Sequence, residues 1–161
     1  MRAGLGFDVH PFSTDAGRPL VLGGARIDGS PGLAGHSDAD VVVHALCDAF
    51  LGAAGLGDIG RHFRDDDPAL HGADSTAILA EVLLMVADAG WSVANADCTI
   101  VAESPILGAH LPIMSELLSS FAGAPVNVKA TRAEGLGAIG RVEGIACMAV
   151  ALLERVESSE Q

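Results

Sequence analysis

The sequence predicts one α/β domain of the α+β type, with a mixed β-sheet and helices packed on one of its faces. Strand-like and helix-like segments alternate along residues 1–161, and no linker, repeat or low-complexity tract divides them. Half of the residues are hydrophobic, enough to fill a core without disulfide bonds. The last strand-like segment, residues 144–156, is apolar at nearly every position. Both of its faces should therefore be covered, one by helices and the other by a second subunit, so we expect an oligomer.

The first half of the chain predicts two strands, a helix and a loop. Residues 2–12 and 18–27 are typical of partner strands joined by a turn near residues 14–17. Residues 38–54 place apolar side chains at helical spacing. Residues 56–73, which are dense in Gly, Asp and His, are predicted to form a loop.

The second half predicts two helices and three strands. A helix should run from Asp74, a good N-cap, to Gly90, a good residue to follow a helix end. Residues 91–102 are typical of a strand, and another helix should begin near Pro112. The closing strands are expected over residues 125–131 and 144–156.

Composition argues against two classes of partner. Twenty-one Asp and Glu oppose nine Lys and Arg, a net charge of −12, so a nucleic-acid backbone would repel the chain. A phosphate ligand would have to be bound by metal ions, backbone amides and a few arginines. No run approaches the roughly 18 apolar residues of a membrane span. The N-terminus lacks a signal-like hydrophobic region and the three cysteines are far apart, so we expect a cytoplasmic protein with reduced thiols.

A candidate metal site begins with Asp8 and His10. Residues two apart in a strand point to the same side, so this carboxylate and imidazole face one point in space. His44, on the first predicted helix, would complete a set of two histidines and one carboxylate. Three protein ligands leave the fourth tetrahedral position of zinc open, which is the catalytic pattern. A hydrogen-bonded pair at a strand end and a solvent-exposed histidine explain the same residues.

The start of the first helix carries several polar residues. Ser37 is a natural N-cap, and Asp40 can return the bond as a capping box. Asp40, His44 and Asp48 recur every four residues and form a polar stripe opposite the apolar face. His36 and Ser37 lie at the positive end of the helix dipole, where free amides can bind an anion such as phosphate.

Two loops offer further ligands. In residues 56–68, two glycines let the backbone approach a ligand and Asp58 can accept hydrogen bonds from hydroxyls. In residues 129–144, a glycine-rich segment with Arg132 and Glu134 could hold phosphates and a hard cation. From these residues alone, an acidic surface loop is the better explanation of the first segment, and any glycine-rich hairpin would look similar to the second.

Together, three segments resemble the 2-C-methyl-D-erythritol 2,4-cyclodiphosphate synthases of the non-mevalonate isoprenoid pathway. They are GLGFDVHPF at the N-terminus, AGHSDADVVVHALCDAFLGAAGLGDIG in the first third, and VNVKAT followed by EGLGAIGRVEGIACMAVALL near the end. The similarity runs from residue 2 to about residue 153, in the same order and spacing.

The resemblance implies a reaction and an assembly. The 2-phosphate of 4-diphosphocytidyl-2-C-methyl-D-erythritol 2-phosphate would attack the β-phosphorus, release CMP and close 2-C-methyl-D-erythritol 2,4-cyclodiphosphate. The enzyme would be a homotrimer with each active site between neighbouring subunits. An isoprenoid diphosphate could lie in a cavity on the threefold axis, near Arg141.

The resemblance also implies a role for each site residue. Asp8, His10 and His44 would hold Zn²⁺, Glu134 would hold Mg²⁺ or Mn²⁺ with the substrate diphosphate, and His36 and Arg132 would be catalytic. The substrate contacts fall in four segments: Asp8, Val9 and His10 with His36 and Ser37; Asp58, Ile59, Gly60, Phe63 and Asp65; Ala102, Pro105, Ile106, Leu107 and Gly108; and Thr131, Arg132, Glu134 and Arg141.

Four departures from the family pattern concern the nucleotide half of the site and the central cavity. Ile106 stands where members carry Lys, Arg132-Ala133 where they carry two threonines, Ala138 where they carry a bulky apolar residue, and Met148 where they carry Glu. Arg132 is expected to replace the charge missing at Ile106. Two other functions stay open: a catalytically weakened trimer that binds zinc and nucleotide, and a zinc-dependent phosphate-ester hydrolase.

Overall fold

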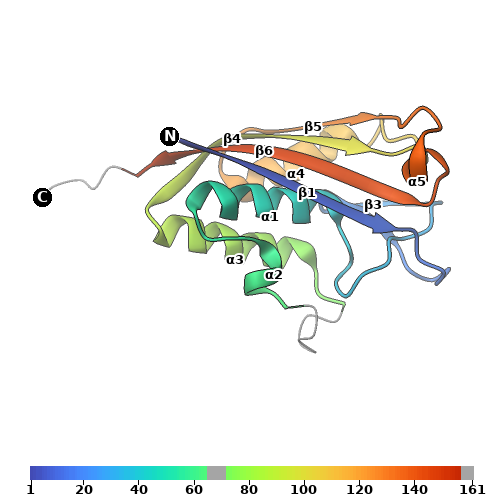
Figure 1. Ribbon diagram of the computed structural model, residues 1–161, viewed down its shortest axis with the longest axis horizontal. Helices are drawn as coiled ribbons and strands as arrows, with labels where there is room; N and C mark the ends of the chain where they lie inside the picture. The colour runs from blue at the N-terminus through green and yellow to red at the C-terminus, as the bar shows by residue number, and fades with distance from the viewer. Residues whose placement is uncertain (65–71, 157–161) are drawn as a thin grey trace, which may run out of the picture.

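The computed structural model describes residues 1–64 and 72–156, which form a four-stranded sheet with its longer helices on one face (Figure 1). The strand order is β1 (Arg2–Pro11), β6 (Gly144–Arg155), β4 (Trp91–Val101) and β5 (Val126–Thr131). β6 runs antiparallel to both β1 and β4, whereas β4 and β5 are parallel. The predicted mixed sheet is therefore confirmed.

The predicted pairing of residues 18–27 with the first strand is wrong. These residues form β2 (Leu20–Leu22) and β3 (Ala25–Ile27), a separate two-stranded sheet. Gly23 and Gly24 between them have positive φ, and their N–H groups donate to the Asp40 carboxylate at 2.8 and 2.7 Å. All ten residues of β1 pair with the long C-terminal strand β6 instead, whereas a three-residue strand could pair with only a few of them.

Three helices cover the sheet: α1 (Val41–Ala54), α3 (Ser75–Asp88) and α4 (Leu111–Ala122). Two short ones, α2 (Ile59–His62) and α5 (Gly137–Gly140), interrupt predicted loops. Asp74 caps α3 by accepting from the Thr76 amide, Gly90 follows the helix end with positive φ, and proline lies in the first turn of α4. These boundary predictions are confirmed because each depends on local chain chemistry.

Two glycines set the distance between β1 and α1. A Cβ atom added to Gly4 would lie 2.0 Å from the carbonyl oxygen of Ala49, and one on Gly6 would lie 1.9 Å from that of Ala45. The helix backbone therefore rests directly on this face of the strand. Because strand side chains alternate, Asp8 and His10 continue the same face toward the start of α1.

On the other face of the sheet, β1 and β6 carry an apolar row that is open in the single chain. Phe7 and Met148 are cross-strand partners, as are Leu5 and Val150, and all four side chains are exposed. Val9 extends the row along β1. The expected cover for the second face of β6 is therefore not supplied by the chain itself.

Two composition-based expectations can be compared with the structure. All three cysteines, Cys47, Cys98 and Cys147, are buried and unpaired. In the described part of the chain, every helix is too short or too polar to cross a membrane.

Candidate metal centre and two cavities

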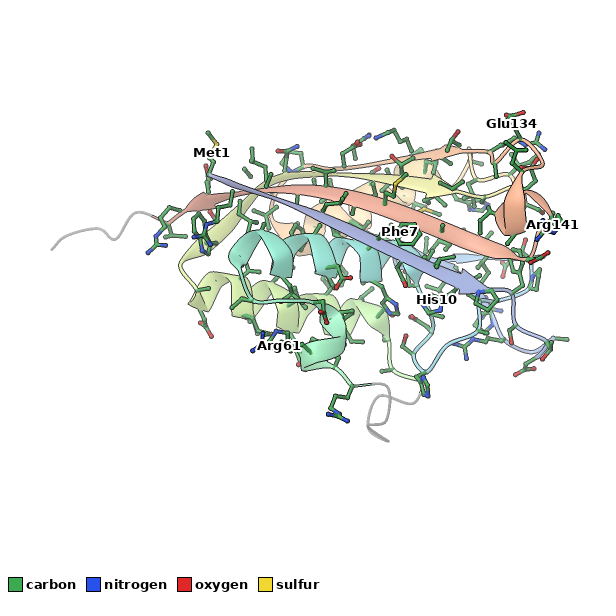
Figure 2. All side chains as sticks on the ribbon, in the orientation of Figure 1. Met1, Phe7, His10, Arg61, Glu134 and Arg141 are labelled. Carbon is green, nitrogen blue, oxygen red and sulfur yellow. The ribbon has the colours of Figure 1, made fainter. Side chains whose placement is uncertain are left out.

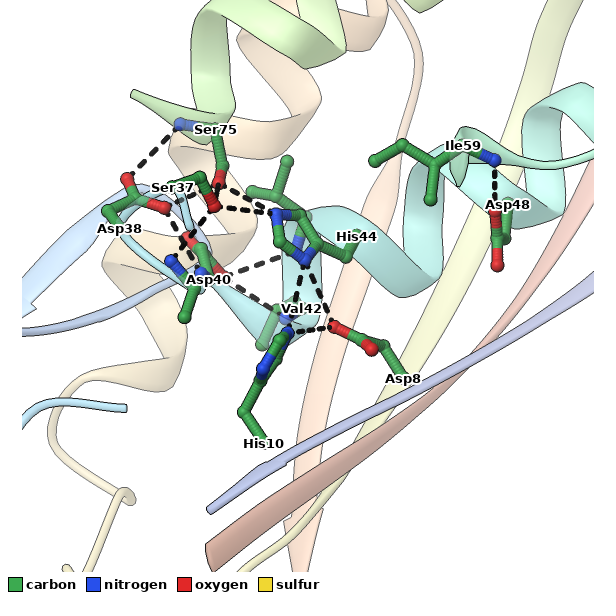
Figure 3. Close-up of polar contacts among 12 residues, drawn as sticks. Asp8, His10, Ser37, Asp38, Asp40, Val42, His44, Asp48, Ile59 and Ser75 are labelled. Carbon is green, nitrogen blue, oxygen red and sulfur yellow. Dashed lines mark hydrogen bonds and ion pairs between the residues drawn. The ribbon is translucent and has the colours of Figure 1, made fainter. Parts of the chain in front are cut away.

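Three ligand atoms from β1 and α1 converge at one point (Figure 3). Oδ2 of Asp8 lies 3.0 Å from Nε2 of His10 and 3.1 Å from Nδ1 of His44. The two ring nitrogens are 3.4 Å apart. The structure thus brings together the residues that the sequence singled out on a strand and a helix.

The donor set fits a metal cation. Nδ1 of His10 lies 2.9 Å from the carbonyl oxygen of Ala34, which can only accept, so Nδ1 carries a proton and Nε2 is the nitrogen available to a cation. Nδ1 of His44 and the Asp8 carboxylate face the same point. Two nitrogens and one oxygen at this spacing suit a divalent metal, and each imidazole is oriented through its second nitrogen, as metal-bound histidines usually are.

The metal-site contacts shift two pKa values in opposite directions. Burial disfavours the charged form of Asp8, but hydrogen bonds and charge from His10 and His44 outweigh it, so the pKa of Asp8 falls well below its ordinary range. Burial also opposes protonation of His10, but the Asp8 carboxylate outweighs that effect and raises the pKa of His10. Without a cation, the site therefore favours an ion pair.

Asp40, rather than Ser37, is the N-cap of α1. Its carboxylate accepts from the backbone N–H groups of Val42 and Val43, each at 3.1 Å, as well as from the glycine turn of β2–β3. Asp40 is fully buried, so the predicted polar stripe opposite the apolar face is wrong at this residue. Burial raises the pKa of Asp40 to about 6, and the backbone amides oppose the rise. Since Asp40 occupies two amides of the first turn, an anion there must rely on other donors.

A cavity of about 200 Å³ opens beside the metal ligands. His36 and Ser37 lie on one wall, and Ile59, Gly60 and Phe63 on another, as expected for substrate contacts. The lining also includes residues that the sequence did not single out for this role: Asp48, Arg64 and Ile78.

The second wall is held in place by two aspartates. Asp48 accepts from the amide of Ile59 at 2.7 Å, and Asp58 caps α2 by accepting from the Arg61 amide at 2.9 Å. Asp58 was expected to bind substrate hydroxyls, and its cap bond uses Oδ1. Asp65, another expected contact, lies outside the described residues.

A second cavity, of about 470 Å³, lies against the ends of β4 and β5. Its lining includes seven of the residues expected around the nucleotide: Ala102, Pro105, Ile106, Leu107, Gly108, Thr131 and Arg132. The two cavities share no lining residue. They flank β1 and β5, which are the opposite edges of the sheet.

Glu103 organises one wall of the second cavity. Nε and an Nη atom of Arg132 donate to one Glu103 oxygen, at 2.9 and 2.5 Å, and the other oxygen accepts from the Ala133 amide at 3.2 Å. This arginine lowers the pKa of Glu103. The Glu103 side chain is 13% exposed and that of Arg132 is 67% exposed, so the guanidinium still faces solvent. Sequence spacing gave no signal for Glu103, because the pair joins residues 29 positions apart.

Glu134 and Arg141 lie at the α5 end of the molecule, and neither lines either of the two cavities of the single chain (Figure 2). Glu134 is exposed and has a φ of 52°. Arg141 donates to the Glu143 carboxylate at 2.7 Å. Val9, the last expected contact, faces the open apolar side of the sheet rather than the metal ligands.

Comparisons with known proteins agree with this geometry. The model of the YgbB family matches residues 1–154. A 2-C-methyl-D-erythritol 2,4-cyclodiphosphate synthase from Bordetella avium is 54% identical over 157 residues, covering 96% of each chain. IspF of Plasmodium falciparum in a CDP complex matches with a TM-score of 0.83 at 28% identity, over 97% of each chain. A CDP-bound structure of a synthase of the same name gives 0.85 at 35% identity, covering 95% of this chain and 100% of the other.

Proposed function

The chain belongs to the YgbB family, and from this membership we propose that it converts 4-diphosphocytidyl-2-C-methyl-D-erythritol 2-phosphate to 2-C-methyl-D-erythritol 2,4-cyclodiphosphate and CMP. The observation that carries the proposal is the convergence of Asp8, His10 and His44 on one point at the wall of a cavity. The relatives' shared name supplies the reaction.

Zinc is the proposed metal at this point. Two imidazole nitrogens and one carboxylate oxygen are typical zinc ligands, and they leave one position for a substrate oxygen. A zinc ion bound there supplies Lewis acidity toward the β-phosphate and offsets charge on the transferred phosphoryl group.

The chain's own side chains orient the substrate. The attacking 2-phosphate oxygen is already anionic, so the reaction needs alignment of two repelling phosphates more than it needs a general base. His36 and the Ser37 hydroxyl on one wall are placed to hold the attacking phosphate. Ile59, Gly60 and Phe63 on the opposite wall would enclose the methylerythritol portion, with the free oxygen of Asp58 beside them.

The nucleotide half is proposed to occupy the second cavity. Residues 102–108 would surround the cytosine, while Thr131 and Arg132 would contact the CDP phosphates. Glu134 would hold Mg²⁺ or Mn²⁺ with the diphosphate, since hard cations prefer carboxylate and phosphate oxygens. Glu103 holds the Arg132 guanidinium in place and offsets part of its charge, and the exposed N–H groups of Arg132 would donate charged hydrogen bonds to the phosphates.

A homotrimer is proposed because a single chain keeps the two halves of the substrate site apart. The cavities flank opposite edges of the sheet, so a neighbouring subunit could bring its nucleotide cavity to the metal centre. The exposed apolar row of Leu5, Phe7, Val9, Met148 and Val150 would be buried between subunits. An isoprenoid diphosphate in the threefold cavity would then be expected near Arg141.

A product assay tests the reaction. The purified protein, with zinc and Mg²⁺, is incubated with the substrate, and phosphorus NMR follows the products. Equal amounts of CMP and cyclic diphosphate are expected. CMP with a linear product would indicate the hydrolase, and neither product would indicate a binding protein with lost turnover.

A further inference from the structure

Both ring nitrogens of His44 make polar contacts, and those of Nε2 come from Ser75 on α3 and from Ser37 in the loop before α1 (Figure 3). Its Nδ1 faces Asp8 and His10, whereas its Nε2 lies 2.9 Å from Oγ of Ser75 and 3.2 Å from Oγ of Ser37. Ser75 is the first residue of α3 and is fully buried. Nothing in the sequence spacing links it to His44, which lies 31 positions earlier.

The direction of these hydrogen bonds follows from Asp38. Its carboxylate accepts from the Ser75 hydroxyl, from the Ser75 amide at 3.1 Å and from the Asp40 amide at 3.1 Å. Once the Ser75 hydroxyl has donated its proton to Asp38, only its lone pairs remain for His44. Nε2 of His44 must therefore be the donor. This leaves Nδ1 as the nitrogen that can bind a cation, and in the absence of a cation a proton on Nδ1 can be donated to Asp8 Oδ2, 3.1 Å away.

Ser37 alone would not impose this choice. Its hydroxyl accepts from the Ala39 amide at 3.0 Å, and its own proton remains able to turn toward Nε2. With Ser37 as the donor, His44 could carry its proton on Nδ1, the nitrogen that faces the proposed metal. The Ser75 hydroxyl lies closer to Nε2 than the Ser37 hydroxyl does, and its proton is donated to Asp38. It can therefore only accept from Nε2, which excludes that tautomer.

We infer that Asp38 and Ser75 form a positioning relay that fixes His44 in the tautomer protonated at Nε2 and so aims its Nδ1 lone pair at the metal position. The inference rests on the proposed metal role of His44. It also links the first residue of α3 to the metal centre, although α3 contributes no ligand. Partners of this kind typically change metal affinity by about 10- to 100-fold.

Ser75→Ala is the most direct test. It removes the hydroxyl and leaves the Ser75 amide bonded to Asp38, so the 35–40 loop keeps that anchor. Zinc affinity is measured by competition with a chromogenic chelator, and a loss of about 10- to 100-fold is expected. Asp74→Ala is the matched control: it removes the N-cap of the same helix, which contacts Thr76 and not His44, so thermal stability should fall while zinc affinity stays the same.

A spectroscopic signature separates tautomer control from general loosening. Long-range proton–nitrogen correlations of the His44 ring in the metal-free protein should show protonated Nε2 in the wild type. In Ser75→Ala they should show a mixture of tautomers, because Nε2 then contacts only the Ser37 hydroxyl, which can either donate or accept. In Ser37→Ala the wild-type pattern should persist.

The outcomes are distinguishable. Equal zinc affinity for Ser75→Ala and the wild type, or an unchanged tautomer in Ser75→Ala, would overturn the relay and leave the proposed metal site standing. A wild-type protein that binds no zinc would contradict the proposed function itself. A larger loss in Ser37→Ala than in Ser75→Ala would assign the tautomer to Ser37 instead.

Discussion

Gly6 on β1 lies against the carbonyl oxygen of Ala45 on α1, at a distance where an added Cβ atom would be 1.9 Å from that oxygen. Ala45 directly follows His44, and Gly6 precedes Asp8 by two positions on the same strand face. The approach of strand and helix backbones at this glycine therefore sets the separation between the proposed metal ligands. The site depends on this packing as much as on the ligands.

Gly6→Ala should destabilise the protein and displace the metal ligands. The new methyl group would meet backbone, which cannot move aside as a flexible side chain can, so a loss beyond the roughly 1–3 kcal/mol of ordinary overpacking is expected. Chemical denaturation measures the free energy of unfolding. Gly52→Ala is the control, since a Cβ there meets no other group within 4 Å and should stabilise α1 by about 0.5–1 kcal/mol. A Gly6→Ala protein as stable as the wild type would contradict the close packing.

His44→Ala should abolish stoichiometric zinc binding. It removes one of three ligands and leaves Asp8 and His10, which fall short of the usual protein ligand set of a catalytic zinc site. Metal content after dialysis against limiting zinc is the measurement. His62→Ala serves as control, because His62 is exposed on α2 and contacts the backbone of Leu56. Full zinc occupancy in His44→Ala would remove this residue from the metal site.

The metal-free protein should show a pH window of extra stability from Asp8 and His10. The lowered pKa of Asp8 contributes stability above its ordinary value of 3.8, which is lost as pH falls through the folded value. The raised pKa of His10 contributes stability below its ordinary value of 6.5, which is lost as pH rises through the folded value. Both contributions are present between these ordinary values.

Asp8→Asn removes the carboxylate from this pair. The difference in free energy of unfolding between the metal-free wild type and Asp8→Asn should therefore be largest between pH 3.8 and 6.5 and shrink on either side. Denaturation at a series of pH values in the presence of a chelator tests this. A difference that is flat across pH would rule out the ion pair.

Arg132→Ala should weaken CDP binding by about 1.5–3 kcal/mol, the range for hydrogen bonds to charged groups. The loss should shrink as salt rises, because the guanidinium is exposed and screening weakens exposed pairs most. Calorimetric titration with CDP at two ionic strengths is the measurement, and zinc affinity should not change. Arg26→Ala is a matched control, since Arg26 is also exposed in a single ion pair but does not line the nucleotide cavity. An unchanged CDP dissociation constant for Arg132→Ala would show that this arginine does not bind the diphosphate.

Phe7→Asp should dissociate the proposed trimer. It places a charge in the apolar row that β1 and β6 expose, where burial without a partner is costly. Sedimentation velocity should show a monomer. The product assay should show lost synthase activity, because the two cavities then belong to separate molecules. Leu84→Asp, at an exposed apolar residue on α3, should remain trimeric. A wild-type monomer at micromolar concentration would contradict the assembly.

The sequence by itself determined features that depend on local chemistry. Alternation along a strand placed Asp8 and His10 on one face, capping residues fixed the ends of α3, and the apolar composition of residues 144–156 indicated a strand that is apolar on both faces. The family resemblance supplied the expected substrate and metal. These inferences need only the neighbours of each residue along the chain, or a whole-chain pattern.

Tertiary structure decided which distant groups meet. It paired β1 with β6 instead of residues 18–27, and it used Asp40 rather than Ser37 to cap α1 because the β2–β3 turn supplies two further donors to that carboxylate. It also placed Ser75 behind His44 and Glu103 beneath Arg132. Each of these contacts joins residues whose separation in sequence is unrelated to any helical or strand period, so only the packing of helices on the sheet could bring them within hydrogen-bonding distance.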